Sequence, residues 1–157
     1  MICIVYYKDM NILLLYTTNS GSTQTAADIV KSDLTAAGNT VTMKNPKSST
    51  FDEVKSADLI IIASPSWDYE GKEGQPHEDF NNLLKEFEGK TLADKSFAIL
   101  GLGDSSYTHF CGAVDVFEES IKKLSAKLII PSLRIDRYYQ NHDAPQLVKS
   151  WTKSLTT

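Results

Sequence analysis

A hydroxyl-rich stretch near the start of the chain has the residue types and the spacing to bind an anion. A short apolar run at 12–16 predicts a buried parallel strand, and a helical pattern follows it almost at once. A loop in this position presents the free N–H groups and the positive dipole end of a helix, and a glycine lets an anion approach closely. Side-chain donors add to these groups. The candidate residues are Thr18, Asn19, Ser20, Gly21, Ser22 and Thr23.

The anion would be held by neutral donors alone, because no Lys or Arg lies between Met10 and Lys31. The loop therefore lacks the lysine of the nucleoside triphosphate motif G-x-x-x-x-G-K-[ST], and it also lacks G-x-G-x-x-G. An ordinary N-capped helix after a strand is the alternative explanation of the same residues. The order and spacing of the stretch, together with two unusual loops downstream, favour a binding site.

The two downstream loops each carry an aromatic residue that could lie against a flat ligand. In the first, Trp67 comes four residues after a buried strand, too far out to serve the core of that strand. In the second, two glycines expose backbone N–H groups, and Tyr107 can lie flat on a ring while its hydroxyl stays in water. The alternatives are that Trp67 covers the sheet edge, that Tyr107 staples a helix start, and that Asp104 or Ser105 caps that helix. Two aromatics beside a phosphate site indicate a slot for a planar ring with a phosphate tail.

Strands alternate with helices along the whole chain, which is typical of a doubly wound α/β domain. Five strands favour the order 2-1-3-4-5 in one parallel sheet, with the ligand crevice at the carboxyl ends of strands 1 and 3. A long irregular loop at 64–76 falls at this switch point, and a loop at 101–108 lies beside it. The predicted strands are 12–16, 40–43, 59–63, 97–100 and a last strand at 128–130 and 133–135 that is interrupted near Pro131; the predicted helices are 23–37, 51–57, 77–87, 109–126 and 144–155.

The composition fits a single domain and disfavours binding to nucleic acids. Of the 157 residues 41% are hydrophobic, enough for a full core, and a net charge of −4 disfavours a nucleic-acid binder. Between Ser64 and Ser120, 12 Asp and Glu stand against 4 Lys, so this segment has a net charge of −8. An acidic surface here suits a basic partner or disfavours a second negative charge nearby. Solvated faces of two acidic helices explain the same count.

The start of the chain does not match the pattern of the rest. Residues 1–10 precede the first well-patterned strand, and we expect them to be a dispensable extension of a domain at 11–157. This segment has no basic n-region and no cleavage site, so it is a poor signal peptide, and no run reaches transmembrane length. Cys3 and Cys111 form no C-x-x-C pair, and Cys111 is expected to be a buried small residue. These features predict a cytoplasmic protein.

In its motifs the chain resembles a short-chain flavodoxin over residues 11–157. The segment 103–124 (GDSSYTHFCGAVDVFEESIKKL) resembles the family's third loop and the helix after it, and 132–136 (SLRID) resembles its last strand. The resemblance implies a three-layer flavodoxin-like fold and non-covalently bound flavin mononucleotide (FMN). In the first loop and its flanks, the residues that fit the family pattern are Leu14, Leu15, Tyr16, Thr18, Gly21, Thr23 and Ala27.

The resemblance also implies a role for each candidate residue. Residues 18–23 would hold the phosphate, and Tyr107 would stack on one side of the isoalloxazine ring. Asp68 would lie near flavin N5. The other side of the ring would meet Pro65, Ser66 and Trp67, and its pyrimidine end would meet the backbone groups of Leu102, Gly103, Asp104 and Cys111.

The function implied by the resemblance is that of a low-potential one-electron carrier. FMN would cycle through quinone, semiquinone and hydroquinone between a reductase and acceptor redox enzymes. These partners would dock transiently, and partly by charge, to a protein that we expect to be a monomer. The three His have no carboxylate or nucleophile partner at a useful spacing, so we expect no catalytic set, and we expect no metal site either. The alternatives are an FMN-dependent NAD(P)H or quinone reductase of the same fold and a flavin-free interaction module.

Position 68 departs from the family pattern. In flavodoxins the residue after the tryptophan-type position is often glycine, and a peptide flip there supplies a carbonyl to N5 of the neutral semiquinone. Here the residue is Asp68, and a flipped peptide commonly requires a positive φ, which costs a residue other than glycine, although Asp and Asn tolerate it best. We therefore predict that Asp68→Gly stabilises the semiquinone. Unchanged one-electron potentials in that variant would contradict the prediction.

Overall fold

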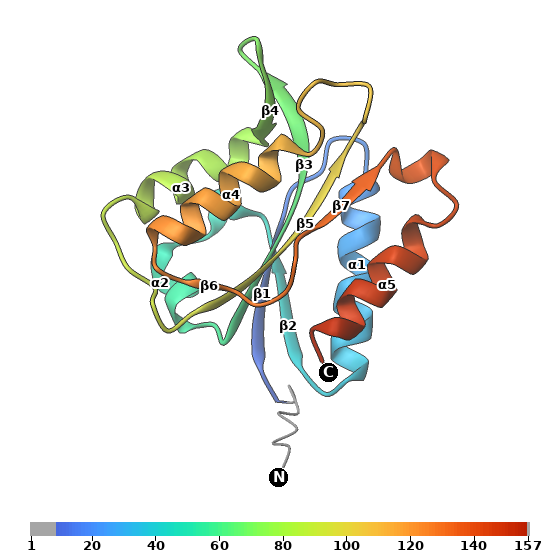
Figure 1. Cartoon of the computed structure of the whole chain (residues 1–157). Helices are drawn as coiled ribbons and strands as arrows, with labels where there is room; N and C mark the ends of the chain where they lie inside the picture. The colour runs from blue at the N-terminus through green and yellow to red at the C-terminus, as the bar shows by residue number, and fades with distance from the viewer. Residues whose placement is uncertain (1–8, 157) are drawn as a thin grey trace.

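The structure is a computed structural model that describes residues 9–156, in which a seven-stranded sheet lies between two layers of helices (Figure 1). The central order is β2-β1-β3-β5-β6, with all neighbours parallel; β7 also pairs with β5 in parallel, and β4 pairs with β3 antiparallel. The strands are β1 (Asn11–Tyr16), β2 (Thr40–Lys44), β3 (Leu59–Tyr69), β4 (Lys72–Pro76), β5 (Ser96–Gly103), β6 (Lys127–Leu128) and β7 (Leu133–Asp136). The α-helices are α1 (Ser22–Ala36), α2 (Phe51–Ser56), α3 (Asn81–Phe87), α4 (Gly112–Lys123) and α5 (Ala144–Ser154).

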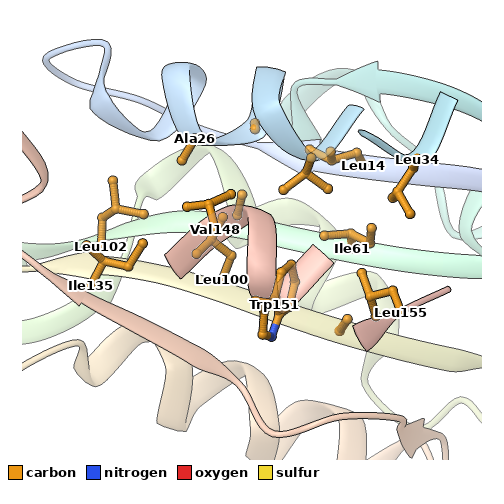
Figure 2. Packing of buried hydrophobic residues seen from close by; sticks show 14 of the residues in the cluster. Leu14, Ala26, Leu34, Ile61, Leu100, Leu102, Ile135, Val148, Trp151 and Leu155 are labelled. Carbon is orange, nitrogen blue, oxygen red and sulfur yellow. The ribbon is translucent and has the colours of Figure 1, made fainter. Parts of the chain in front are cut away.

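Helices cover both faces of the parallel strands, so these strands are continuous apolar runs rather than alternating ones. In β1, Leu14 belongs to the core cluster that includes residues of α1 and α5, whereas Leu15 belongs to the cluster that includes residues of α2, α3 and α4. Figure 2 shows the first cluster, in which Val148 and Trp151 of α5 lie with Leu100 of β5. With both faces covered, the loops at the strand ends are left to form a binding site.

The predicted doubly wound α/β fold with a parallel sheet is confirmed, but the predicted count of five strands is wrong. One additional strand arises because the interrupted last strand is two separate strands, β6 and β7, on either side of a segment that contains Pro131. Proline has no N–H group to donate to a sheet, so it commonly marks such a break. Both pieces pair with β5, which is the fourth of the five predicted strands. The neighbours predicted for the strands at 12–16, 59–63 and 97–100 are therefore observed.

The other additional strand is β4, and it corrects the prediction of an irregular loop at 64–76. Strand β3 continues through Trp67 to Tyr69, turns at Glu70 and Gly71, and returns as β4. Both turn residues have positive φ, 52° and 77°, which is the geometry of a tight two-residue hairpin turn of type I′. The segment therefore forms a hairpin that projects beyond the rest of the sheet (Figure 1).

The hairpin is fixed by close contact with the N-terminus of α4. Gly74 of β4 and Gly112 of α4 approach so closely that a Cβ added at Gly112 would lie 2.8 Å from both Cα and O of Gly74. In addition, Ser66 Oγ on β3 accepts a hydrogen bond of 3.0 Å from the backbone N–H of Ala113. Because no side chain on the residue that precedes α4 caps this helix, Ser66 provides the cap from another part of the chain.

Other boundaries differ from the predicted ones by a few residues. Helix α3 begins at Asn81 after a 3₁₀ turn at Glu78–Phe80, and α4 begins at Gly112 rather than at residue 109. Strand β5 runs to Gly103, into the predicted loop. Residues 1–8 lie outside the described residues, so the dispensable extension stays a prediction. In the described part of the chain, none of the helices combines the length and the apolar character that crossing a membrane requires.

The contact between the two glycines predicts an unusual response to Gly112→Ala. Replacing a helical glycine by alanine ordinarily stabilises a protein by about 0.5–1 kcal/mol. Here the new Cβ would collide with the backbone of Gly74, which cannot rotate away, so we expect a destabilisation of about 1–3 kcal/mol. Urea unfolding of the apoprotein measures the change, and its sign is decisive: a variant as stable as the wild type, or more stable, would contradict the prediction.

Candidate functional site

The carboxyl ends of the parallel strands meet at one edge of the sheet, and a cavity of about 530 Å³ lies there. Its walls come from the loop after β1, from the β3–β4 hairpin, from the segment between β5 and α4, and from the residues after β7. The candidate residues that line it are Asn19, Ser20, Ser22, Pro65, Ser66, Trp67, Asp68, Leu102, Gly103, Asp104, Tyr107 and Cys111. The structure thus brings the three predicted loops to one cavity.

The first loop leaves the N-terminus of α1 without a side-chain cap. The residue before the helix is Gly21, in the left-handed region at φ 88°, and no side chain hydrogen-bonds to the helix start. The side chain of Thr18 instead closes the turn, since its Oγ1 accepts a hydrogen bond of 2.9 Å from the N–H of Gly21. The alternative of an ordinary side-chain-capped helix does not hold, and the first N–H groups of α1 are available to a ligand.

Two threonine hydroxyls beside this helix start are buried without a hydrogen-bond partner. Thr17 is 1% exposed and Thr23 is fully buried, and neither Oγ1 has a partner in the structure. An unpaired buried hydroxyl costs roughly 1–3 kcal/mol, so native proteins rarely keep one without a use. Neither residue lines the cavity surface itself, but both flank the loop whose uncapped N–H groups suit an anion.

Two aromatic rings border the cavity and remain exposed. Trp67 is 45% exposed and Tyr107 is 55% exposed, although large aromatic side chains are usually well buried. Trp67 therefore leaves nearly half of its surface free for a ligand. Tyr107 is not a helix staple, because α4 begins only at Gly112. Asp68, between Trp67 and Tyr69, is exposed in strand β3, where the pairing with β4 shifts register.

The third loop is held by carboxylates rather than by a helix cap. Asp136 at the end of β7 accepts hydrogen bonds from the N–H and Oγ of Ser105, at 2.8 and 2.7 Å. Asp104 accepts from the N–H of Ser106 at 2.8 Å and from Nε of Arg137 at 3.0 Å. The hydrogen bonds from Ser106, and then that from Arg137, lower the pKa of Asp104 to about 2. Neither Asp104 nor Ser105 caps α4, so that alternative is wrong.

Cys111 fixes the end of the same loop. It is 1% exposed in the left-handed region at φ 51°, and burial raises the pKa of its thiol to about 12, as expected for an inert buried residue. Its carbonyl accepts a hydrogen bond of 3.0 Å from Nη1 of Arg134. A Cβ at Gly103 would lie 2.9 Å from the Cys111 sulfur, so glycine is needed here for close packing of the loop.

Comparison with known proteins decides the family. The sequence profile of the family described as flavodoxin matches residues 14–151. A flavodoxin from Maridesulfovibrio salexigens is 36% identical over 125 residues, which cover 79% of this chain and 84% of that protein. The chain belongs to the flavodoxin family. The expectation of an FMN-binding electron carrier, stated from the motifs, is thereby confirmed.

Solved flavodoxin structures have the same fold. Oxidised flavodoxin 2 from Bacillus cereus is 27% identical and superposes with a TM-score of 0.82, over 92% of this chain and 96% of that one. A Fusobacterium nucleatum flavodoxin bound to flavin mononucleotide is 20% identical and superposes with a TM-score of 0.79, over 93% and 96%. At the latter identity the likeness concerns the fold alone.

The residues at the cavity fit FMN as the cofactor of this flavodoxin. The uncapped start of α1 and the unpaired hydroxyl of Thr23 suit a phosphate. The exposed rings of Trp67 and Tyr107 suit the two faces of a flat heterocycle. Both features are unfavourable in the empty protein and become favourable around such a ligand.

Several residues that line the cavity are not among the site residues predicted from the sequence. Glu73 and Gly74 lie in β4, within the hairpin that replaces the predicted irregular loop. The segment after β7 was missed as well, although its position at the carboxyl end of a parallel strand was a usable signal. Tyr139 in this segment places its hydroxyl 3.4 Å from Ser20 O. The missed lining residues are Glu73, Gly74, His109, Arg137, Tyr138, Tyr139 and Gln140.

The unpaired hydroxyl of Thr23 predicts opposite effects on stability and binding in Thr23→Val. Valine has the same shape and removes a buried polar group without a partner, so the apoprotein should be as stable as the wild type or more stable. If the hydroxyl donates to the FMN phosphate, the affinity for FMN should fall about tenfold, which corresponds to one hydrogen bond to a charged group. Quenching of flavin fluorescence measures the affinity, and urea unfolding measures the stability.

Two controls make the Thr23 test specific. Riboflavin lacks the phosphate, so its affinity should not change in Thr23→Val. Thr42→Val alters an exposed threonine on β2, away from the cavity, and should leave FMN binding unchanged. Equal losses for FMN and riboflavin, or an apoprotein that is clearly destabilised, would show that Thr23 has a structural role instead.

Proposed function

We propose that this flavodoxin is a low-potential one-electron carrier that converts no substrate of its own and passes electrons from a reductase to acceptor redox enzymes. The observation that carries the proposal is the convergence of two exposed aromatic residues, Trp67 and Tyr107, on a cavity beside an uncapped helix N-terminus. A planar redox ring with a phosphate tail matches both parts of this site. The proposal includes a monomer and a cytoplasmic location.

The phosphate of FMN would be held by the loop of residues 18–23 without a cation. Ser20 and Ser22 present their hydroxyls 3.4 Å apart at the loop, next to the uncapped N–H groups of the first turn of α1. The first turn of α1 contains no acidic residue that would repel an anion. The remaining ligands would be Thr18, Asn19, Gly21 and Thr23.

The ring would lie between the second and third loops. When bound, FMN supplies one-electron redox chemistry. Trp67 would contact one side of the ring and Tyr107 the other, with Asp68 near N5. Both loops are anchored at the start of α4, through Ser66 and through Cys111, so their separation is fixed before the ring binds. The further contacts would come from Pro65, Ser66, Leu102, Gly103, Asp104 and Cys111.

Acidic side chains around the cavity support the low potential. Asp68, Glu73 and Asp104 line it, and like charge opposes the addition of further negative charge nearby. The exposed edges of the two aromatic residues would let a partner protein approach the ring directly. Contacts of this kind are small and transient, as is typical of electron-transfer encounters.

The backbone at position 68 bears on the prediction for Asp68→Gly. Asp68 lies in the extended strand β3 and does not have a positive φ, so a flip of its peptide requires a local rearrangement. Asp68→Asn is the matched control, because Asn keeps the tolerance of Asp for positive φ but removes its charge. A shift in the first one-electron potential that appears in Asp68→Gly and not in Asp68→Asn therefore reports on the backbone.

An absorption spectrum followed by stepwise reduction tests the proposed function. We expect a yellow protein, or a colourless one that becomes yellow when FMN is added, and reduction by dithionite in two separate one-electron stages. Reduced nicotinamide with a quinone should give no turnover at a rate above that of free FMN. A protein that cannot be reconstituted with FMN, or one that turns over quinone with reduced nicotinamide, would overturn the proposal.

A further inference from the structure

The segment after β7 carries a positive charge at the cofactor cavity. Arg137 lines the cavity, and among the described lining residues it is the one Lys or Arg. The same walls contain three carboxylates, those of Asp68, Glu73 and Asp104. The sequence-based site assignments did not include Arg137, which contributes to none of the proposed contacts with phosphate or ring.

Three interactions, one of the backbone and two of the guanidinium, hold Arg137 in place. The backbone N–H of Arg137 donates to Gly103 O at 2.9 Å, which ties the residue to the end of β5. Its Nε donates to Asp104 Oδ1 at 3.0 Å and lies 3.9 Å from Asp136 Oδ1. The side chain is 47% exposed, so it borders both the cavity and solvent. The guanidinium is thus an ordered charge at the rim rather than a free surface arginine.

The backbone of Arg137 is in a conformation that disfavours arginine. Its φ of 45° and ψ of 62° place it in the left-handed region, which is unfavourable for a residue other than glycine. Glycine would satisfy this turn and could still donate the N–H to Gly103. A strained residue at a functional site points to a use for its side chain.

We propose that Arg137 sets the potential of the second one-electron step by offsetting the negative charge around the ring. The inference rests on the proposed function, because it concerns the same FMN site. The second electron comes from the reductase without a proton, so it makes the site more negative by one charge. Arg137 opposes that charge, whereas Asp68, Glu73 and Asp104 add to it. Arg137 would therefore raise the affinity for fully reduced FMN relative to one-electron-reduced FMN.

Arg137→Gln tests the proposal because it removes the charge but retains hydrogen-bonding groups. We expect the affinity for fully reduced FMN to fall about three- to tenfold relative to the affinity for one-electron-reduced FMN. A tenfold change in this ratio corresponds to a shift of about 59 mV in the second one-electron potential. Oxidised FMN should bind to the apoprotein with nearly unchanged affinity. Arg137→Lys keeps the charge and should retain most of the wild-type potential. The difference between Arg137→Gln and wild type should shrink at 1 M salt, where screening acts over about 3 Å.

Controls separate the electrostatic role from a structural one. Lys123→Gln removes one positive charge from an exposed position at the far end of α4, and it should leave both potentials unchanged. Equal second potentials in Arg137→Gln and wild type would overturn the inference alone. The inference would also be overturned if Arg137→Lys and Arg137→Gln shifted the second potential equally and both bound oxidised FMN more weakly. Arg137 would then only hold the loop at Asp104. A wild-type protein that binds no FMN would overturn the proposed function, and the inference with it.

Discussion

The parallel pairing of four strands is the constraint on which the rest of this structure depends. β1, β3, β5 and β7 run in the same direction, so all their carboxyl ends lie at one edge of the sheet. Backbone hydrogen bonds continue the pairing beyond the strands, from the N–H of Thr17 to Ala63 O and from the N–H of Arg137 to Gly103 O. Residues that are more than a hundred positions apart in the sequence, such as Ser20 and Tyr139, meet there because the parallel strands place their carboxyl ends side by side.

The N-terminus of α4 is the second support of the site. It has no cap from its own flanking residue, and three separate segments converge on it. Ser66 binds the Ala113 N–H, Gly74 packs on Gly112, and Arg134 binds the Cys111 carbonyl. The two loops that carry Trp67 and Tyr107 are therefore connected to the same few atoms. A small displacement of this helix start would move the segments that carry Trp67 and Tyr107 relative to each other.

In the proposed FMN site, neutral groups would hold the phosphate and charged groups would border the ring. The phosphate loop has no basic residue, so its attraction for an anion rests on oriented N–H groups and hydroxyls. The acidic groups that line the cavity, by contrast, would border the ring, together with one arginine. In the proposed carrier, this separation lets cofactor affinity and reduction potential depend on different residues. Salt would then affect the potential more than the binding of the phosphate.

The sequence alone determined the strands, loops and helices that can be predicted from neighbouring residues. The apolar run of β1, the hydroxyl-rich loop and the helical pattern of α1 follow from neighbouring residues, and so did the class of fold and the resemblance to flavodoxins. The buried state of Cys111 followed from its apolar neighbours. These features depend on residue types within a few turns of chain.

Tertiary structure decided what depends on contacts between distant segments. The hairpin of β3 and β4 is held at the cavity because Gly74 can lie against Gly112, a contact between residues 38 positions apart. Arg137 and Tyr139 reach the cavity because β7 pairs with β5, and that pairing joins segments far apart in the sequence. Side-chain caps, close glycine contacts and charge pairs of this kind form only after the sheet has brought the segments together. Local propensity therefore specified the strands and helices, and long-range packing specified the shape and the charge of the site.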